Sequence, residues 1–156
     1  MKIIVTGSAG SFGSAFSHGM GDVPGAKTIG VDELSRRGAA ANLVWFNKHS
    51  VDHVFEQLDV TSASDMDDLL GHHPDADAVV HVSAHSAVTS SVTDTRHDRD
   101  TSARGTLNAN EAVRPHTPGA ALLFSSTNKV VEWSQVHCRR SSPPGRGQTQ
   151  EGAHDV

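Results

Sequence analysis

The sequence contains no tyrosine and only one cysteine, and aromatic residues make up 4% of its 156 positions. A single cysteine, Cys138, cannot form an internal disulfide, and no basic and apolar leader precedes the first apolar run, which follows Lys2. The sequence also has no apolar run long enough to cross a membrane. We therefore expect a protein of the reducing cytoplasm.

An excess of positive charge is missing as well, because the formal net charge is −5. Without a basic surface, neither nucleic acid nor an anionic membrane is expected as a partner. Apolar residues make up only 36% of the chain, which predicts that part of it is poorly packed. The eleven histidines do not fall at zinc-ligand spacings, so no metal site is expected. At this length we expect one full domain.

The feature that organises the chain is a glycine-spaced turn directly behind a short apolar strand, Ile3–Val5. Three glycines at three-residue intervals let the backbone turn tightly, approach a pyrophosphate, and pack the next helix on the sheet. That helix is expected over about residues 11–20, and its first N–H groups would hold the phosphate. The residues predicted to bind it are Gly7, Gly10, Ser11, Phe12 and Gly13.

A second strand, predicted over residues 27–31, ends at Asp32, which follows Gly13 by 19 residues. At about this spacing a dinucleotide fold places an acid on the adenosine ribose, where the carboxylate accepts from the 2′-hydroxyl and repels a 2′-phosphate. The alternative is an aspartate that only begins a turn. The register with the glycine turn favours the ribose contact, and hence NAD over NADP.

Two further strand ends carry candidate cofactor residues. The strand predicted over 54–58 runs into Asp59 and Val60, an acid and a backbone amide placed to meet the adenine amino group and a ring nitrogen. A strand over 78–82 ends in Val82, followed by Ser83 and Ala84, small residues suited to pass beneath a cofactor.

Helices are expected between these strands. One contains Met66, Leu69 and Leu70 and begins with Ser62 or Ser64 as its cap. After a polar, irregular stretch over 86–98, another is predicted over about 100–113, ended by Arg114–Pro115, before a strand over 121–124. Alternating strands and helices predict βαβ units, and thus an α/β fold with a parallel sheet covered on both faces. Ligands should gather at its carboxyl edge.

These motifs resemble the NAD-dependent epimerase/dehydratase family, the extended short-chain dehydrogenase/reductases. Thr6–Gly13 match its T-G-x-x-G-x-x-G turn, Asp59–Val60 its acid after the third strand, and Gly105–Asn108 with Glu111–Arg114 its central helix. Within the family, residues 32–39 and 125–130 are most similar to CDP-paratose (CDP-tyvelose) 2-epimerases. The resemblance covers about residues 1–131 and implies a three-layer, Rossmann-like doubly wound sheet that is incomplete at its C-terminus.

The resemblance also implies a chemistry. Such an epimerase holds NAD, transfers a hydride from a nucleotide sugar to the nicotinamide, and returns it to the other face of the sugar carbon. It implies cofactor contacts at Ser35 and Arg36, and a homodimer. The family's proton relay is a tyrosine with a lysine four residues later, aided by a hydroxyl that matches Thr127. Because the chain has no tyrosine, Thr127 is the one catalytic residue we expect it to retain.

Other departures concern packing and the C-terminus. Ser102 takes the place of the family's asparagine in the central helix, while Arg104 and Asn110 stand where small or apolar residues are expected, which predicts weaker packing.

Residues 1–132 are predicted to form the NAD-binding domain, and 133–156 a non-homologous, disordered tail left by a shifted reading frame or gene decay. Two functions stay open: a nucleotide-sugar epimerase by descent, inactive alone, and a non-catalytic NAD-binding module or decayed fragment.

Overall fold

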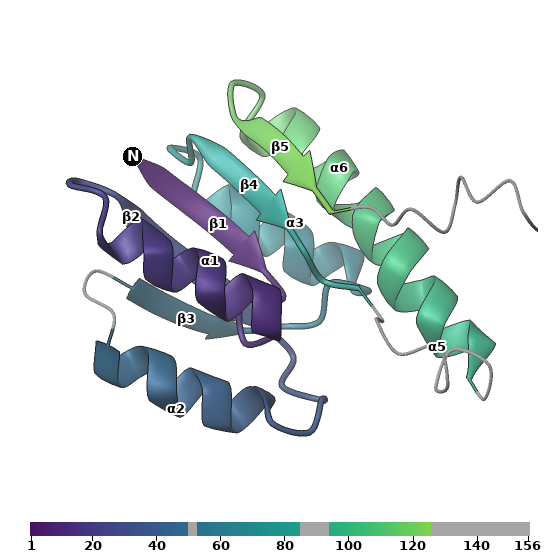
Figure 1. Ribbon diagram of the computed structural model, residues 1–156. Helices are drawn as coiled ribbons and strands as arrows, with labels where there is room; N and C mark the ends of the chain where they lie inside the picture. The colour runs from purple at the N-terminus through teal and green to yellow at the C-terminus, as the bar shows by residue number, and fades with distance from the viewer. Residues whose placement is uncertain (50–52, 85–93, 126–156) are drawn as a thin grey trace, which may run out of the picture. The chain divides into compact units, whose positions relative to one another are not determined.

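A computed structural model describes residues 1–49, 53–84 and 94–125, all within one unit, Met1–Ser125. These residues form a five-stranded sheet in the order β3-β2-β1-β4-β5, and every neighbouring pair is parallel (Figure 1). The strands are β1 (Lys2–Thr6), β2 (Lys27–Asp32), β3 (His53–Gln57), β4 (Ala78–His81) and β5 (Ala121–Phe124). The predicted α/β class with a Rossmann-like parallel sheet is therefore confirmed.

Helices cover both faces of this sheet. They are α1 (Ser11–Gly21), α2 (Ala39–His49), α3 (Ala63–His72), α5 (Thr95–Arg99), the π-helical segment η1 (Asp100–Arg104) and α6 (Gly105–His116). α1 packs beside α2, and α3 packs beside α6 behind the sheet (Figure 1). The result is the three-layer arrangement predicted from the alternation of strands and helices.

Side chains of the central strand β1 alternate between the two layers of core. Ile3 and Val5 are buried with Val80 against Phe16 and Met20 of α1. Ile4, which is fully buried, belongs to the larger cluster on the opposite face. That cluster includes Met66, Leu69 and Leu70 of α3 and Ala109, Ala112 and Val113 of α6. Burial on both faces explains why β1 reads as a continuous apolar run.

The strand order reverses direction beside β1. From β1 the chain proceeds outward to β2 and β3, then returns to the other side of β1 to form β4 and β5. In open parallel sheets, such a switch point opens the crevice in which ligands bind.

The segment before α6 is more helical than the sequence predicts. Residues 95–98, expected to be irregular, belong to α5, which begins where the Asp94 carboxylate accepts a hydrogen bond from the His97 backbone N–H at 3.0 Å. Helical structure then continues through η1 into α6. α6 extends past the expected stop at Pro115 to His116, because a proline in the last turn removes one N–H without preventing a short continuation. The rest of the irregular stretch, 85–93, lies outside the described residues.

The expected packing defects at Arg104 and Asn110 are wrong, since both side chains are exposed. The Arg104 guanidinium pairs with the Asp100 carboxylate at 3.0 Å, and the Asn110 amide donates to the Thr106 carbonyl at 2.9 Å. The resemblance to the family placed these two residues on the central helix. Which side of that helix faces solvent is set by its orientation against the sheet, and only the structure shows it. Neither leaves a buried polar group without a partner.

Candidate functional site

The turn after β1 brings two strand ends into close backbone contact. Gly7 has φ of +70°, and a Cβ there would lie 2.9 Å from the backbone nitrogen of Ser83, just beyond β4. A Cβ on Gly13 would overlap the Gly7 carbonyl. Position 7 thus requires glycine for its backbone conformation, and position 13 requires glycine so that α1 can pack onto the turn. These are the roles that the glycine spacing predicts.

The N-terminus of α1 is open to a ligand. Its first residue, Ser11, follows Gly10, which supplies no side-chain cap, and the first turn contains no acid. The first intrahelical bond runs from Ser14 N–H to the Gly10 carbonyl, so the N–H groups of the three residues between them remain available. A helix N-terminus without its own carboxylate favours an anion such as a pyrophosphate.

A hollow of about 420 Å³ lies against this helix end, within the size range of small-molecule sites. The predicted pyrophosphate residues all contribute to it. It is lined by Gly7, Ala9, Gly10, Ser11, Phe12, Gly13, Asp32, Arg36, Arg37, Ala39, Asn42, Val82, Ala84 and Ser125.

Asp32 is held rigidly beside the glycine turn. One carboxylate oxygen accepts from the Ala9 backbone N–H at 3.1 Å, and the other accepts from that of Leu34 at 2.8 Å. Leu34 itself has φ of +62°, an uncommon conformation for a side-chain-bearing residue. Asn42 of α2 donates to the Ala9 carbonyl at 2.9 Å and so ties α2 to the same turn. The arrangement fixes an anionic acceptor between β1 and β2.

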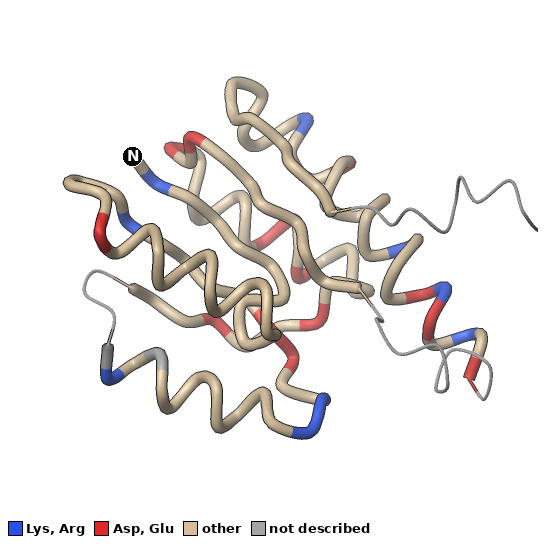
Figure 2. The backbone as a smooth tube through the Cα atoms, viewed as in Figure 1, with Lys and Arg blue, Asp and Glu red and all other residues tan. Residues whose placement is uncertain are grey.

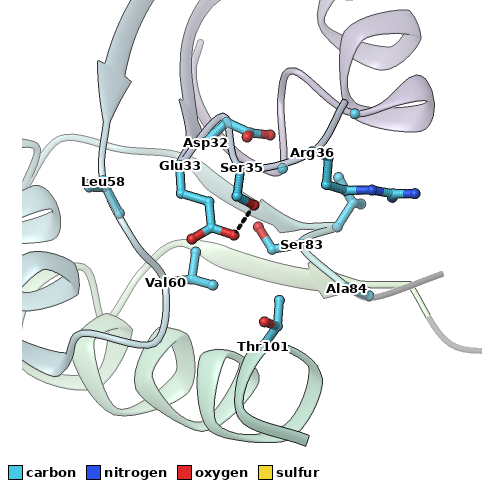
Figure 3. A pocket seen from close by; sticks show the side chains of 12 residues that line it. Asp32, Glu33, Ser35, Arg36, Leu58, Val60, Ser83, Ala84 and Thr101 are labelled. Carbon is cyan, nitrogen blue, oxygen red and sulfur yellow. Dashed lines mark hydrogen bonds between the residues drawn. The ribbon is translucent and has the colours of Figure 1, made fainter. Parts of the chain in front are cut away.

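A second, smaller hollow continues from the first and shares Gly7, Gly10, Asp32, Arg36, Val82 and Ala84 with it. Of the predicted cofactor residues, Ser35, Val60 and Ser83 line this second hollow (Figure 3). The structure thus gathers the predicted cofactor residues other than Asp59, from the segments after β1, β2, β3 and β4, into two adjoining hollows, here called the crevice.

Two predicted site residues are not placed in the crevice. Asp59 lines neither hollow: its Oδ1 accepts from the Thr61 backbone N–H at 2.8 Å and its Oδ2 from the Thr61 hydroxyl at 2.7 Å. Its role in adenine binding stays a prediction. Thr127, the predicted catalytic residue, lies outside the described residues.

Several lining residues were not predicted from the sequence. Glu33, Leu58 and Thr101 line the smaller hollow, while Arg37 and Asn42 line the larger one. Thr101 belongs to η1, a segment that the turn motifs do not locate. Glu33 carried a usable signal, because an acid directly after Asp32 adds a second carboxylate at the same strand end.

A buried histidine of β4 contacts β1 through a hydrogen bond between side chains. His81 is 3% exposed, and its Nδ1 lies 2.8 Å from the Thr6 hydroxyl on β1. Its Nε2 has no hydrogen-bond partner among the described residues. Burial away from water lowers the pKa of His81 from 6.5 to about 4, so the ring is neutral at pH 7.

Charges of both signs meet at the mouth of the crevice. Figure 2 shows acidic residues at the end of β2, where Asp32 and Glu33 lie, and basic residues just before α2, where Arg36 and Arg37 lie. Within the described ranges, no group of three or more His, Cys, Asp or Glu residues is arranged to hold a metal ion. Nor does that part of the chain contain a helix with the length and apolar character needed to span a membrane.

Comparisons with known proteins agree with this geometry. The profile of the NAD dependent epimerase/dehydratase family matches residues 3–150. CDP-paratose 2-epimerase of Salmonella typhi is 32% identical over 130 residues, which cover 83% of this chain and 38% of that protein. The dTDP-glucose 4,6-dehydratase 1 of Escherichia coli (strain K12) is 34% identical over 114 residues, 73% of this chain and 31% of that protein.

Among solved structures, a UDP-glucose-4-epimerase from Stenotrophomonas maltophila with bound NAD superimposes with a TM-score of 0.72 at 27% identity, covering 89% of this chain and 40% of that one. These matches confirm the resemblance found in the motifs and NAD as the cofactor of such proteins. The chain spans about two fifths of the length of the CDP-paratose 2-epimerase that it matches.

Proposed function

Because the chain belongs to the NAD-dependent epimerase/dehydratase family, we propose that its residues 1–132 form an NAD-binding domain. We propose residues 133–156 as a tail outside this domain, although the family match continues to residue 150. The observation that carries the proposal is the contact between Gly7 and the Ser83 backbone beside an uncapped α1. Beside this contact, at the sheet's switch point, lies a hollow that borders Gly7, Gly10 and Gly13, where no side chain separates a pyrophosphate from the backbone. The boundary at residue 132 lies outside the described residues.

The chain's own residues fit the cofactor in three parts. The N–H groups at the start of α1 would hold the pyrophosphate over Gly7, Gly10 and Gly13, with Ser11 and Phe12 beside it. Asp32 would accept from the adenosine ribose, which favours NAD over NADP, with Ser35 and Arg36 nearby. Val82, Ser83 and Ala84 would pass beneath the cofactor at the end of β4.

For the reaction, we propose descent from a nucleotide-sugar epimerase acting on a CDP-sugar, as the similarity to CDP-paratose 2-epimerase supports. NAD, when bound, supplies a reversible hydride acceptor. The chain supplies binding and orientation, but its 156 residues include no tyrosine to move the proton of the sugar hydroxyl. Thr127 alone, a hydroxyl without that base, leaves the chain inactive by itself.

An assay of the purified chain with NAD and CDP-paratose or CDP-tyvelose tests this proposal. Proton spectra of the sugar would report conversion at its second carbon. We expect none above the rate without protein, and conversion that scales with protein concentration would contradict the missing relay.

The alternative function is a non-catalytic NAD-binding module or a decayed fragment, and the absent tyrosine favours it for this polypeptide in isolation. Fluorescence titration with NAD distinguishes the binding module from the decayed fragment. A folded module binds NAD saturably, whereas an unfolded fragment shows no saturable binding.

A cytoplasmic location, which the single cysteine supports, and a homodimer are further parts of the proposal. Sedimentation of the chain at several concentrations would test the dimer.

A further inference from the structure

β5 forms one edge of the sheet (Figure 1). Its inner side pairs with β4, and no strand among the described residues pairs with its outer side. The edge is also uncharged, because the sequence contains no Asp, Glu, Lys or Arg between Arg114 and Lys129. The opposite edge, β3, differs, since it carries the acidic Glu56. Charged side chains are one means by which edge strands avoid pairing with another chain, so β5 lacks that protection.

The hydrogen bonds to β4 show which backbone groups of β5 point outward. The N–H groups of Ala121 and Ser125 donate to carbonyls at either end of β4, at 3.0 and 3.2 Å. Because this direction alternates along a strand, Leu123 also turns its N–H and C=O toward β4, whereas Leu122 and Phe124 turn theirs away from it. Both of these residues therefore direct a donor and an acceptor to the outer side of the edge.

The side chains of β5 present apolar surface beside those groups. Leu122 packs against the larger core cluster, so the neighbouring Leu123 lies on the opposite face of the sheet. Leu123 is 53% exposed and Phe124 is 63% exposed. An uncharged edge with exposed apolar side chains on both faces gains most from contact with another apolar strand.

The outward groups of β5 are complementary to themselves. In an antiparallel pair, opposite residues whose N–H and C=O groups face each other exchange two hydrogen bonds. If two copies of β5 meet with Leu123 on the two-fold axis, Leu122 lies opposite the partner's Phe124, and Phe124 lies opposite the partner's Leu122. Leu123 then faces the partner's Leu123 in the closely spaced type of pair, with Cα atoms about 4.5 Å apart.

We propose that two copies of this chain associate through β5 in this register, so that one sheet continues through both. A second copy suits the edge because an uncharged strand places no like charges opposite each other when it pairs with itself. The two-fold pairing is also closed, since each copy covers the edge of the other and leaves no β5 edge free for further growth. The inference rests on the homodimer proposed above and assigns its surface.

Sedimentation velocity of the full 156-residue chain over a range of concentrations measures the dissociation constant of the dimer. Because a strand of four residues buries little area, we expect a weak dimer that dissociates on dilution. Leu123→Lys should raise the dissociation constant about 10-fold or more, because two facing charges replace a leucine pair. Leu107→Lys makes the same change on α6, where Leu107 is 58% exposed, and should leave the constant unchanged.

Cysteine crosslinking tests the register. Leu123→Cys, combined with Cys138→Ser to remove the native thiol, places two thiols opposite each other at the two-fold axis. The oxidant diamide should then join the two copies, because such a pair brings the Cβ atoms close to the distance that a disulfide spans. Phe124→Cys in the same background is the matched control. Its position is more exposed in one copy, but it lies diagonally across from its counterpart, about 7–8 Å away, which is too far for a disulfide.

Four outcomes would overturn the inference, and they are distinguishable. A chain that sediments as a monomer at every concentration removes the proposed homodimer itself. If that monomer also protects the Leu122 and Phe124 N–H groups from deuterium exchange, a segment of the same chain covers the edge. A dimer that Leu107→Lys dissociates and Leu123→Lys does not is formed by α6. Equal crosslinking of Leu123→Cys and Phe124→Cys contradicts the register.

A folding defect is separated from a loss of association by circular dichroism. Leu123 lines neither hollow of the crevice and is half exposed, so Leu123→Lys should keep the spectrum of the unmodified chain. If the lysine variant does not fold, the crosslinking of Leu123→Cys still decides the inference, because a dimer that diamide does not crosslink at position 123 contradicts it.

Discussion

At the scale of single residues, Gly7 is the position on which the crevice most depends. Its φ of +70° and the 2.9 Å separation between a Cβ and the Ser83 nitrogen are two separate obstacles to any side chain. We expect Gly7→Ala to lower the free energy of unfolding by about 2–4 kcal/mol and to abolish NAD binding, because the turn must move away from β4.

Gly25→Ala is the matched control for that substitution. Gly25 has a similar φ of +74°, but no atom lies within 4 Å of its Cβ position. In Gly25→Ala the free energy of unfolding should therefore fall only by the cost of a side chain at positive φ, about 1–2 kcal/mol, and NAD affinity should be retained. Urea denaturation and NAD titration of both variants measure the difference. Equal losses would show that the approach to Ser83 carries no weight.

His81 predicts a pH dependence of stability. Its pKa falls from 6.5 to about 4 on folding because burial disfavours the charged ring, so the unfolded chain binds the proton more readily between these values. The stabilisation is complete above pH 6.5 and is lost as the pH falls toward 4, by on the order of 3 kcal/mol. His53, whose pKa is likewise lowered to about 4, adds to the trend.

His81→Asn isolates the contribution of this ring, because asparagine can still bond the Thr6 hydroxyl but does not titrate. The free energy of unfolding, measured by urea denaturation from pH 4.5 to 7.5, should fall less steeply in the variant than in the unmodified chain. Parallel curves would contradict a neutral, buried His81. Chemical shifts of the ring protons give a direct check on its pKa.

At the scale of elements, the cap of α3 decides between two candidates that the sequence leaves open. The Ser62 hydroxyl accepts from the Asp65 backbone N–H at 3.3 Å, whereas Ser64 lies inside the first turn. Ser62→Ala should destabilise the protein by about 1 kcal/mol, and Ser64→Ala by less than about 0.5 kcal/mol. Denaturation midpoints would measure both, and a reversed order would assign the cap to Ser64.

Elements with strong local signals were predictable, and elements shaped by context were not. β1 is predicted by its short apolar run alone. α3 is predicted by its serine cap and the regular spacing of its apolar residues. The helix over Thr95–Arg99 was missed because its polar sequence has no apolar period. The helix predicted over about 100–113 begins in the structure with the π-helical segment η1, which places Thr101 in the crevice.

At the scale of the whole molecule, the strand order turns separate strand ends into one site. The sequence predicts that the turn after β1, Asp32, and the small residues after β4 share an edge, since parallel strands end together. It does not predict which side chains line the hollow, and so it did not identify Glu33 and Thr101. Side-chain direction at a strand end depends on local turns such as the Asp59–Thr61 bonds, which spacing alone does not contain.

The most direct test of the whole account is a calorimetric titration of the 156-residue chain with NAD and NADP, on a sample whose circular dichroism shows a folded α/β protein. We predict saturable binding of one NAD per chain, and weaker binding of NADP because Asp32 repels the 2′-phosphate. A folded sample that gives no saturable heat with NAD would contradict it.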